Sequence, residues 1–116
     1  MAVVLVADDE PAIRSLVSAV LGRAGYQVLV ASNGVEAVAL FRSSPDRIDL
    51  VLTDIAMPMM DGYHVVQLIR ATKPTARIVC MTAFAAHGPP PGVAILSKPF
   101  TAEALRNCVV QALAGA

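Results

Sequence analysis

Residues 48–54 read Ile-Asp-Leu-Val-Leu-Thr-Asp, and residues 55–62 continue Ile-Ala-Met-Pro-Met-Met-Asp-Gly. An apolar run that stops at an acid and then meets Pro, Asp and Gly predicts a buried parallel strand leading into a loop. In open α/β sheets, ligands bind beyond the carboxyl ends of the strands. We therefore expect Asp54, the last residue of the run, to be presented at such a site rather than buried.

Length and composition favour one domain, residues 1–116, with helices covering both faces of a sheet. Of the 116 residues, 56% are hydrophobic and 16% are charged, which argues against disorder. The longest apolar run, residues 2–7, is far shorter than the about 20 residues of a membrane span. No secretory signal is visible. We expect a cytoplasmic protein that does not engage a membrane.

Charge and cysteine content exclude several other classes. Nine basic and nine acidic residues give a net charge of zero, unlike the basic surface of a nucleic-acid binder. We therefore expect no direct contact with nucleic acid. Cys80 and Cys108 lie in apolar contexts without CxxC spacing, so we expect small core residues rather than a disulfide or a metal site.

Apolar strands and amphipathic helices alternate along the chain. Strands are expected over residues 2–7, 26–31, 48–54, 77–82 and 93–96, and helices over about 11–24, 35–43, 62–72 and 101–113. Gly25 predicts a left-handed helix end, while Asn33 and Thr101 are expected N-caps. The helix over 35–43 is expected to bury Val35, Val38 and Ala39. This alternation predicts a doubly wound, five-stranded parallel α/β sheet.

Polar side chains stand at four strand ends, namely Asp8 with Asp9, Asp54, Thr82 and Lys98. Three carboxylates held together repel one another, and Lys98 supplies only one positive charge. Mg²⁺ prefers oxygen ligands and binds through a few carboxylates together with a substrate phosphate. The cluster predicts a Mg²⁺-assisted phosphoryl-transfer site, in which Asp8 and Asp9 are metal ligands.

Asp54 stands alone at the central strand end and is the best candidate for the nucleophile. A carboxylate can attack phosphorus and form an aspartyl phosphate. Thr82 can donate a hydrogen bond to a phosphoryl oxygen, and Lys98 can form an ion pair with the same group.

The order of these motifs resembles the receiver domain of two-component response regulators, with the chemotaxis-regulator-like fold. The likeness covers essentially the whole chain and rests on Asp8-Asp9, Asp54 with Met57-Pro58 and Asp61-Gly62, Thr82-Ala83 and Lys98-Pro99-Phe100. It implies a flavodoxin-like strand order, 2-1-3-4-5, and phosphoryl transfer to Asp54. It also implies that Mg²⁺ is bound by Asp8, Asp9, Asp54 and the backbone carbonyl of Ala56. The Lys98–Pro99 bond is similar to the family's cis peptide.

The resemblance further implies a signalling phosphoacceptor that catalyses only its own phosphorylation and dephosphorylation. The donor would be a histidine kinase or a phosphotransfer protein, and the target an unknown downstream protein or a covalently linked output domain. Two alternatives stay open. A Mg²⁺-dependent aspartyl-phosphate hydrolase usually needs an acid where Ala56 stands, and a phosphorylation-independent interaction module would not need the intact Asp9, Asp54, Thr82 and Lys98.

Two segments depart from the family pattern. Ile95 occupies the place of the usual aromatic switch residue, three positions before Lys98. Residues 83–92 contain Pro89, Pro90 and Pro91, which are incompatible with a helix interior. We expect the family's fourth helix to be replaced by a Pro-rich loop that is reordered on phosphorylation.

Overall fold

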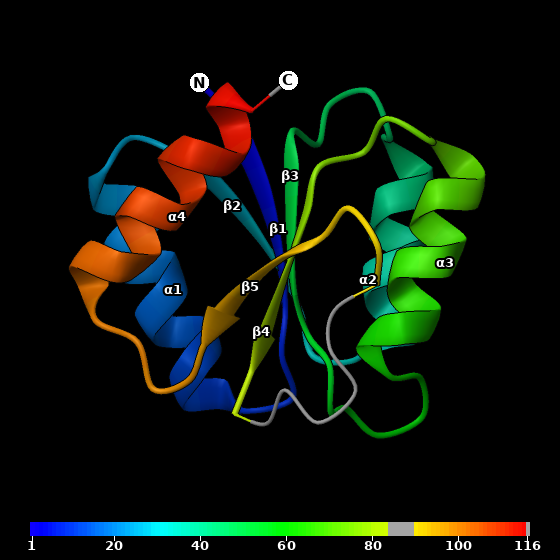
Figure 1. Ribbon diagram of the computed structural model, residues 1–116, viewed down its shortest axis with the longest axis horizontal. Coiled ribbons are helices and arrows are strands. Elements are labelled where there is room, and N and C mark those ends of the chain that lie inside the picture. Colours follow the sequence, from blue (N-terminus) through cyan, green and yellow to red (C-terminus); the bar gives the residue numbers. More distant parts are fainter. Residues whose placement is uncertain (84–89, 116) are drawn as a thin grey trace.

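Five parallel strands form one sheet in the computed structural model, which describes residues 1–83 and 90–115 (Figure 1). The strands are β1 (Val3–Ala7), β2 (Gln27–Ala31), β3 (Leu50–Asp54), β4 (Ile78–Thr82) and β5 (Ala94–Ser97). The helices are α1 (Pro11–Arg23), α2 (Gly34–Ser43), α3 (Gly62–Thr72) and α4 (Ala102–Ala114). Within the described ranges these elements follow the predicted alternation, with boundaries shifted by one or two residues.

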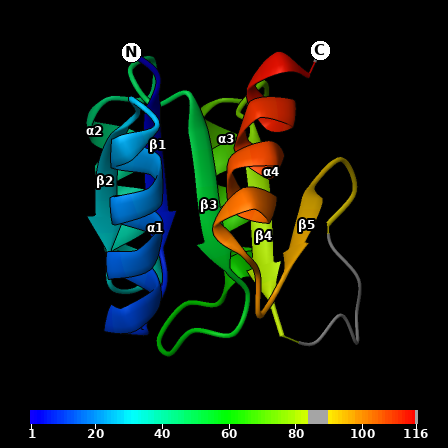
Figure 2. The same ribbon diagram turned by 90° about the vertical axis from the view of Figure 1, so that its left-hand side faces the viewer.

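The sheet has the order β2-β1-β3-β4-β5, so the expected flavodoxin-like topology is confirmed. All neighbouring strands are parallel, with Ala7 opposite Thr53 and Asp54 opposite Met81. The arrowheads in Figure 2 therefore point to one side, which we call the carboxyl edge of the sheet. Both chain ends lie near the opposite side, which we call the amino edge.

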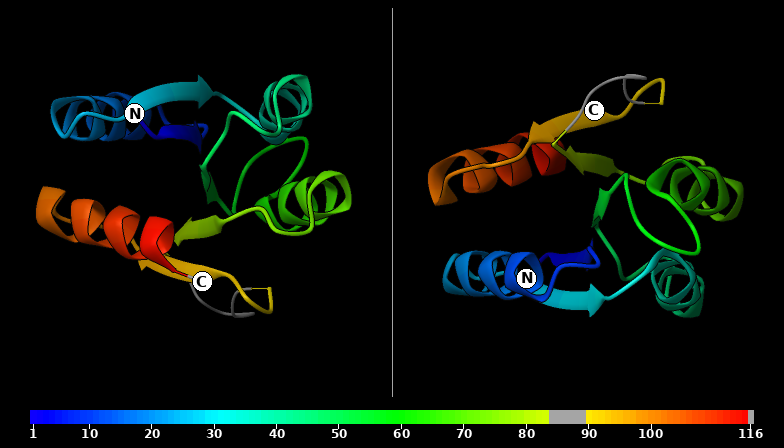
Figure 3. Two further views of the ribbon diagram at one scale, coloured as in Figure 1. Left: turned by 90° about the horizontal axis from the view of Figure 1, so that it is seen from above. Right: turned by 90° about the horizontal axis from the view of Figure 1, so that it is seen from below.

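Two helices cover each face of the sheet. Helices α1 and α4 lie on one face and α2 and α3 on the other, as the end-on views in Figure 3 show. Because side chains alternate along a strand, β4 contributes Val79 and Met81 to one core and Ile78 and Cys80 to the other. Cys80 is buried, Cys108 is half-buried, and both are free thiols, as predicted.

The predicted helix ends are confirmed at three places. Gly25 adopts the left-handed conformation after α1, with φ of 94°. The Asn33 side chain accepts a hydrogen bond from the Glu36 amide at 2.8 Å, and Thr101 accepts one from the Ala104 amide at 3.0 Å. These local signals depend on neighbouring residues alone, which is why the sequence reveals them.

The buried face of α2 differs from the prediction. Val35 is 48% exposed and Ala39 is also exposed, whereas Ala37, Val38 and Phe41 are buried. Phe41 is the largest of these side chains, and its contact with the sheet rotates the helix so that Val35 and Ala39 face solvent. The expectation for Val38 is correct, and the one for Val35 and Ala39 is wrong.

The connection between β4 and β5 is described only at its ends. Residues 90–93 form a turn, and the Val93 amide donates to the Pro90 carbonyl at 3.2 Å. The helix labelled α4 follows β5 and corresponds to the last helix that the sequence predicts. Residues 84–89 lie outside the described residues, so the replacement of a helix by a Pro-rich loop there stays a prediction.

Among the described residues, no helix combines the length and the apolar character needed to cross a bilayer.

Candidate functional site

The candidate site lies at the carboxyl edge, where the ends of β1, β3, β4 and β5 meet. Lys98 links two of the predicted acids, because its Nζ lies 2.7 Å from Asp8 Oδ2 and 3.4 Å from Asp54 Oδ2. Asp8 directly follows β1, Asp54 ends β3, and Lys98 directly follows β5. Residues 90 positions apart in the chain thus form one ion-paired cluster.

The two linked acids are buried, which corrects one expectation. Asp54 is 5% exposed and Asp8 is fully buried, whereas the sequence predicted a presented Asp54. Strands β1 and β4 flank β3 on both sides, and the Lys98 side chain, itself 11% exposed, lies against both acids. A central strand therefore delivers its last side chain to a narrow crevice rather than to open solvent.

The neighbours of Asp54 act on its pKa in opposite directions. Burial and then the negative charge of Asp8 raise the pKa of the Asp54 carboxyl above its usual 3.8. The Lys98 charge and hydrogen bond, together with a hydrogen bond from the Ala56 backbone, lower it by less. The charged form of Asp54 is therefore disfavoured in the ion-free protein. A further cation nearby would stabilise it.

The Lys98 ammonium is stabilised by the same acids. Burial lowers its pKa, but the hydrogen bond to Asp8 and the charges of Asp54 and Asp8 outweigh burial, so the pKa is raised above 10.5. Lys98 therefore stays charged at neutral pH. Glu10 adds a more distant carboxylate, 3.9 Å from Lys98 Nζ.

Asp8 is held in place by contacts that the sequence did not single out. Its Oδ1 accepts a hydrogen bond from the Glu10 amide at 2.9 Å, and its backbone carbonyl accepts one from Arg14 Nη1 at 2.8 Å. Arg14 lies one turn into α1, so its position gives no local hint of this role. These bonds orient Asp8 toward Lys98.

The acids that could hold a metal ion form a group at the end of β1. Carboxylate oxygens of Asp8, Asp9 and Glu10 lie within 4.8 Å of one another, and Asp9 and Glu10 are exposed. Such hard oxygen donors beside a second buried acid, Asp54, suit Mg²⁺. Glu10 was not among the predicted ligands, although its place directly after Asp8-Asp9 is the signal that could have identified it.

Thr82 and the Lys98–Pro99 bond complete the wall of the crevice. Thr82 is 6% exposed at the end of β4, and its backbone carbonyl accepts a hydrogen bond from the Lys98 amide at 2.8 Å. The Lys98–Pro99 peptide bond is cis, as the resemblance implied. Ile95 is half-buried in β5, in register with Cys80.

The loop after Asp54 is fixed at both ends. The Gly62 amide donates to the Ile55 carbonyl at 2.8 Å, and a β-carbon at Gly62 would collide with the Asp54 carbonyl oxygen. Asp61 caps α3 by accepting a hydrogen bond from the His64 amide at 3.0 Å. Only glycine fits the position next to the end of β3, which explains the Asp61-Gly62 pair.

A doubly wound five-stranded sheet with paired acids, a threonine and a lysine at its carboxyl edge defines a receiver-type phosphoacceptor module. The family model of the response regulator receiver domain matches residues 4–110. The chain belongs to the response regulator receiver domain family and has the receiver function of two-component phosphorelays. Receiver domains bind Mg²⁺ at an acidic pocket and interact with histidine kinases and phosphotransfer proteins.

Similar proteins include both large and small signalling proteins. The chain is 39% identical to sensor histidine kinase RcsC of Salmonella typhi over 110 residues, which are 90% of this chain and 11% of that protein. It is 35% identical to sporulation initiation phosphotransferase F of Bacillus subtilis over 81 residues, 70% of this chain and 64% of the relative. The chain thus spans about a tenth of RcsC and less than two thirds of the second relative.

The solved structures include response regulator protein TrrA of Thermotoga maritima in complex with Mg²⁺ and BeF, with a TM-score of 0.88 and 35% identity. That match covers 97% of this chain and 100% of TrrA. A response regulator of closely similar backbone is therefore known in a complex with Mg²⁺ and BeF.

Proposed function

We propose that Asp54 is the phosphoacceptor of this receiver and that Lys98 and Thr82 assist its phosphorylation. The carrying observation is the ion-paired cluster, in which Lys98 Nζ lies 2.7 Å from Asp8 and 3.4 Å from Asp54. A buried carboxylate can act as a nucleophile toward phosphorus. The ammonium beside it would balance part of the negative charge of the resulting aspartyl phosphate. Residues 1–116 would act as one receiver domain.

The residues that would hold Mg²⁺ are Asp8, Asp9 and Asp54, with the backbone carbonyl of Ala56. Their oxygen donors fit the ion, and the raised pKa of Asp54 indicates that another cation nearby would be favourable. When bound, Mg²⁺ supplies positive charge to the transferring phosphoryl oxygens. Glu10 lies in the same acid group, and its exposed carboxylate would add negative charge beside the ion.

In the transfer step, an Asp54 carboxylate oxygen attacks the phosphorus of a phosphohistidine. The new O–P bond forms as the N–P bond to the donor imidazole breaks, and the electron pair of that bond returns to the ring nitrogen. Lys98 moves its ion pair from the Asp54 carboxylate to the new phosphoryl group, and the Thr82 hydroxyl donates to a phosphoryl oxygen. Hydrolysis of the same O–P bond by water would reset the site.

Phosphorylation changes the charge that the surrounding segments respond to. A phosphoryl group adds roughly −1.5 to −2 charges by analogy with other phosphorylated side chains, which draws Thr82 and Lys98 inward. Thr82 ends β4 and Lys98 directly follows β5, so we expect the change to act on β5 and on the connection that precedes it. Ile95, rather than an aromatic residue, would transmit the change within β5.

The donor would be a histidine kinase or a phosphotransfer protein. A largely apolar groove of about 300 Å³ lies beside Lys98 and is lined by Ile13, Leu16, Pro99 and Phe100, among others. Leu16 is 42% exposed, so this groove offers apolar surface next to the reactive group. The phosphorylated receiver would regulate a downstream protein or a covalently linked output domain.

Intact-mass measurement after incubation with Mg²⁺ and acetyl phosphate tests this proposal. We expect one phosphate adduct on the wild type and none on Asp54→Asn. The matched control is Asp46→Asn, which removes a 98% exposed acid at the amino edge and should leave labelling unchanged. An adduct on Asp54→Asn would contradict the assignment, and sustained turnover of a phosphate ester would favour a hydrolase.

A further inference from the structure

The zero net charge of this chain conceals a separation of charge between the two edges of the sheet. Six of the nine basic residues lie where helices end or strands begin, at the amino edge: Arg23, Arg42, Arg47, Arg70, Lys73 and Arg77. Seven of the nine acids lie toward the carboxyl edge: Asp8, Asp9, Glu10, Glu36, Asp54, Asp61 and Glu103. The amino edge is therefore a basic surface that faces away from the phosphoacceptor.

Helix dipoles explain only part of this basic surface. Arg23, Arg42 and Arg70 lie in the last turns of their helices, where a positive charge is favourable. Arg47 and Arg77 lie in loops that precede β3 and β4, outside any helix. Arg47 therefore has no role at a helix end, whereas Arg77 uses one donor at the carboxyl end of α4, because it bonds to the carbonyl of the C-cap residue Gly115.

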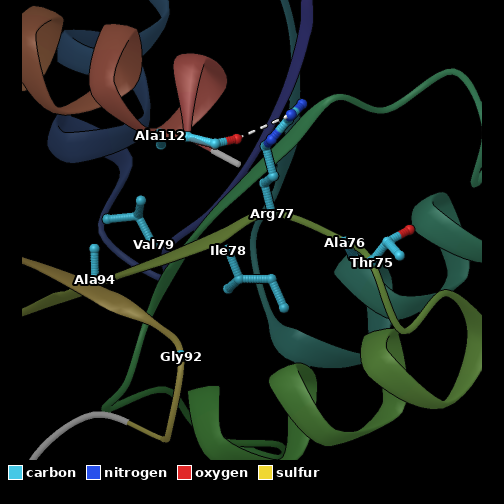
Figure 4. A pocket seen from close by; sticks show the side chains of 9 residues that line it. Thr75, Ala76, Arg77, Ile78, Val79, Gly92, Ala94 and Ala112 are labelled. Atoms are coloured by element: carbon cyan, nitrogen blue, oxygen red, sulfur yellow. Dashed lines mark hydrogen bonds between the residues drawn. The ribbon is translucent and has the colours of Figure 1, made fainter.

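A pocket of about 380 Å³ opens at this basic edge, around the first residues of β4 (Figure 4). Its lining includes Thr75, Arg77, Ile78, Gly92, Ala94 and Ala112, and contains no acidic residue. Arg77 Nη2 donates to the Gly115 carbonyl oxygen at 3.1 Å, marked by the dashed line in Figure 4. A guanidinium has five N–H donors, so most of those of Arg77 stay available to a ligand.

A second guanidinium, that of Arg70, lies next to Gly92, one of the residues that line the pocket. Arg70 Nη2 donates to the Pro91 carbonyl at 2.6 Å, and a β-carbon built on Gly92 would lie 3.0 Å from the same nitrogen. Among the described residues, the ion pairs involve Lys73, Lys98 and His64 and never an arginine. Arg70 and Arg77 thus bond to neutral carbonyls, and no carboxylate of the described chain compensates their charge.

We propose that this pocket binds an acidic peptide segment of a partner protein, with a carboxylate at Arg77 and an adjacent apolar side chain on Ile78, Ala94 and Ala112. The planar guanidinium fork matches a carboxylate in two parallel hydrogen bonds. The volume lies within the range of about 300–1,000 Å³ that is usual for ligand pockets. The acidic carboxyl edge repels the same peptide, which restricts binding to the amino edge.

Binding at the amino edge has a functional consequence. The pocket and the Asp54 crevice lie at opposite ends of β4, so one partner can be held at the amino edge while a phosphodonor reaches Asp54. The pocket would therefore serve as a tethering site that is compatible with phosphorylation.

Fluorescence anisotropy with a labelled peptide of alternating glutamate and leucine tests the proposal. The wild type should bind this peptide, bind it more weakly as salt is raised, and ignore the matched peptide with glutamine for glutamate. Arg77→Gln should weaken binding about tenfold. The matched control is Arg23→Gln, which removes an exposed charge of the same edge outside the pocket and should change affinity less than about twofold.

Equal losses in Arg77→Gln and Arg23→Gln would overturn the pocket in favour of diffuse attraction to the basic edge. Equal binding of the glutamine peptide, or preferential binding of phosphatidylserine vesicles or duplex DNA, would overturn the acidic-peptide assignment. Arg70→Gln gives a second variant if Arg77→Gln does not fold. Acetyl phosphate labelling of Asp54 in these variants should equal that of the wild type. A failure of the peptide-binding proposal can therefore be distinguished from a failure of the phosphoacceptor proposal.

Discussion

At the residue scale, Asp54 shows how a charged group is kept reactive inside a protein. Its carboxyl is 5% exposed, and burial and Asp8 raise its pKa while Lys98 only partly offsets them. An ionised group in that position lowers the stability of the native protein in the absence of a metal ion. Under the proposed function this cost is functional, because a phosphoryl group and a cation at Asp54 would both need the charge.

We predict that Asp54→Asn raises the free energy of unfolding at pH 7 without Mg²⁺ by about 1 kcal/mol, contrary to most substitutions, which destabilise by a similar amount. The neutral amide removes the buried charge that burial and Asp8 disfavour. Urea unfolding of both proteins in a chelating buffer measures the difference. Asp46→Asn, at a fully solvated acid, should change stability by less than about 0.5 kcal/mol.

The difference in free energy of unfolding between Asp54→Asn and the wild type should become smaller as the pH is lowered. Because the folded pKa of Asp54 is raised above its usual 3.8, the folded protein binds this proton more readily than the unfolded chain. Lowering the pH through the folded pKa therefore removes the cost of the charge in the wild type. The stability gain of Asp54→Asn should shrink as the pH falls toward and below 3.8, and a constant gain would contradict the linkage.

Met59 is a second residue whose backbone departs from the ordinary pattern. It has φ of 70°, a left-handed conformation that side chains with a β-carbon disfavour, and it is 77% exposed. Met59→Gly should stabilise the protein by up to about 1 kcal/mol, because the strain is relieved and little buried surface is lost. A denaturant melt measures this, and Met57→Gly should instead destabilise the protein because Met57 is buried.

At the element scale, helix starts hold the polar residues of the crevice in place. The turn from Lys98 through Phe100 leads directly into α4, whose first turn is capped by Thr101. The cap bond is local, but it fixes where the chain leaves the site. The position of the site residues therefore depends on the helix ends as well as on the strands.

Thr101→Ala should lower the free energy of unfolding by about 1 kcal/mol, because it removes the 3.0 Å bond to the Ala104 amide. Thr101→Ser keeps the hydroxyl and should retain most of the stability. Thermal unfolding followed by circular dichroism compares the three proteins. Equal losses in the alanine and serine variants would show that the methyl group, rather than the cap bond, is responsible.

At the scale of the whole molecule, metal binding and folding are linked, because the acids meet only in the folded sheet. Mg²⁺ at ten times its Kd should raise the free energy of unfolding by about 1.4 kcal/mol. The midpoint of urea unfolding, measured against Mg²⁺ concentration, gives this increment. Asp9→Asn should reduce it strongly, because Asp9 belongs to the exposed part of the acid group.

The control for this linkage is Asp46→Asn, which leaves the acid group intact and should show the wild-type increment. A Mg²⁺ effect that persists unchanged in Asp9→Asn would place the ion elsewhere. Equal stabilisation by Na⁺ at matched ionic strength would show that the effect is general charge screening rather than binding of Mg²⁺ at a site.

The sequence alone determined the order of elements, the sheet topology through family resemblance, and the residues that stand at the strand ends. Strand and helix periodicity, Gly25 and the caps at Asn33 and Thr101 are local properties, so neighbouring residues suffice to reveal them. Asp8, Asp54 and Lys98 were identifiable because parallel strands bring their carboxyl ends to one edge.

Only the tertiary structure decided how exposed these groups are and what they contact. It placed Asp54 in a buried crevice, turned Val35 to solvent, bonded Arg14 to the Asp8 carbonyl and set Arg77 at the pocket of the amino edge. Each outcome depends on contacts between segments that are distant in the chain. Side-chain paths and burial follow from packing across the whole sheet, and no local pattern of residues encodes them.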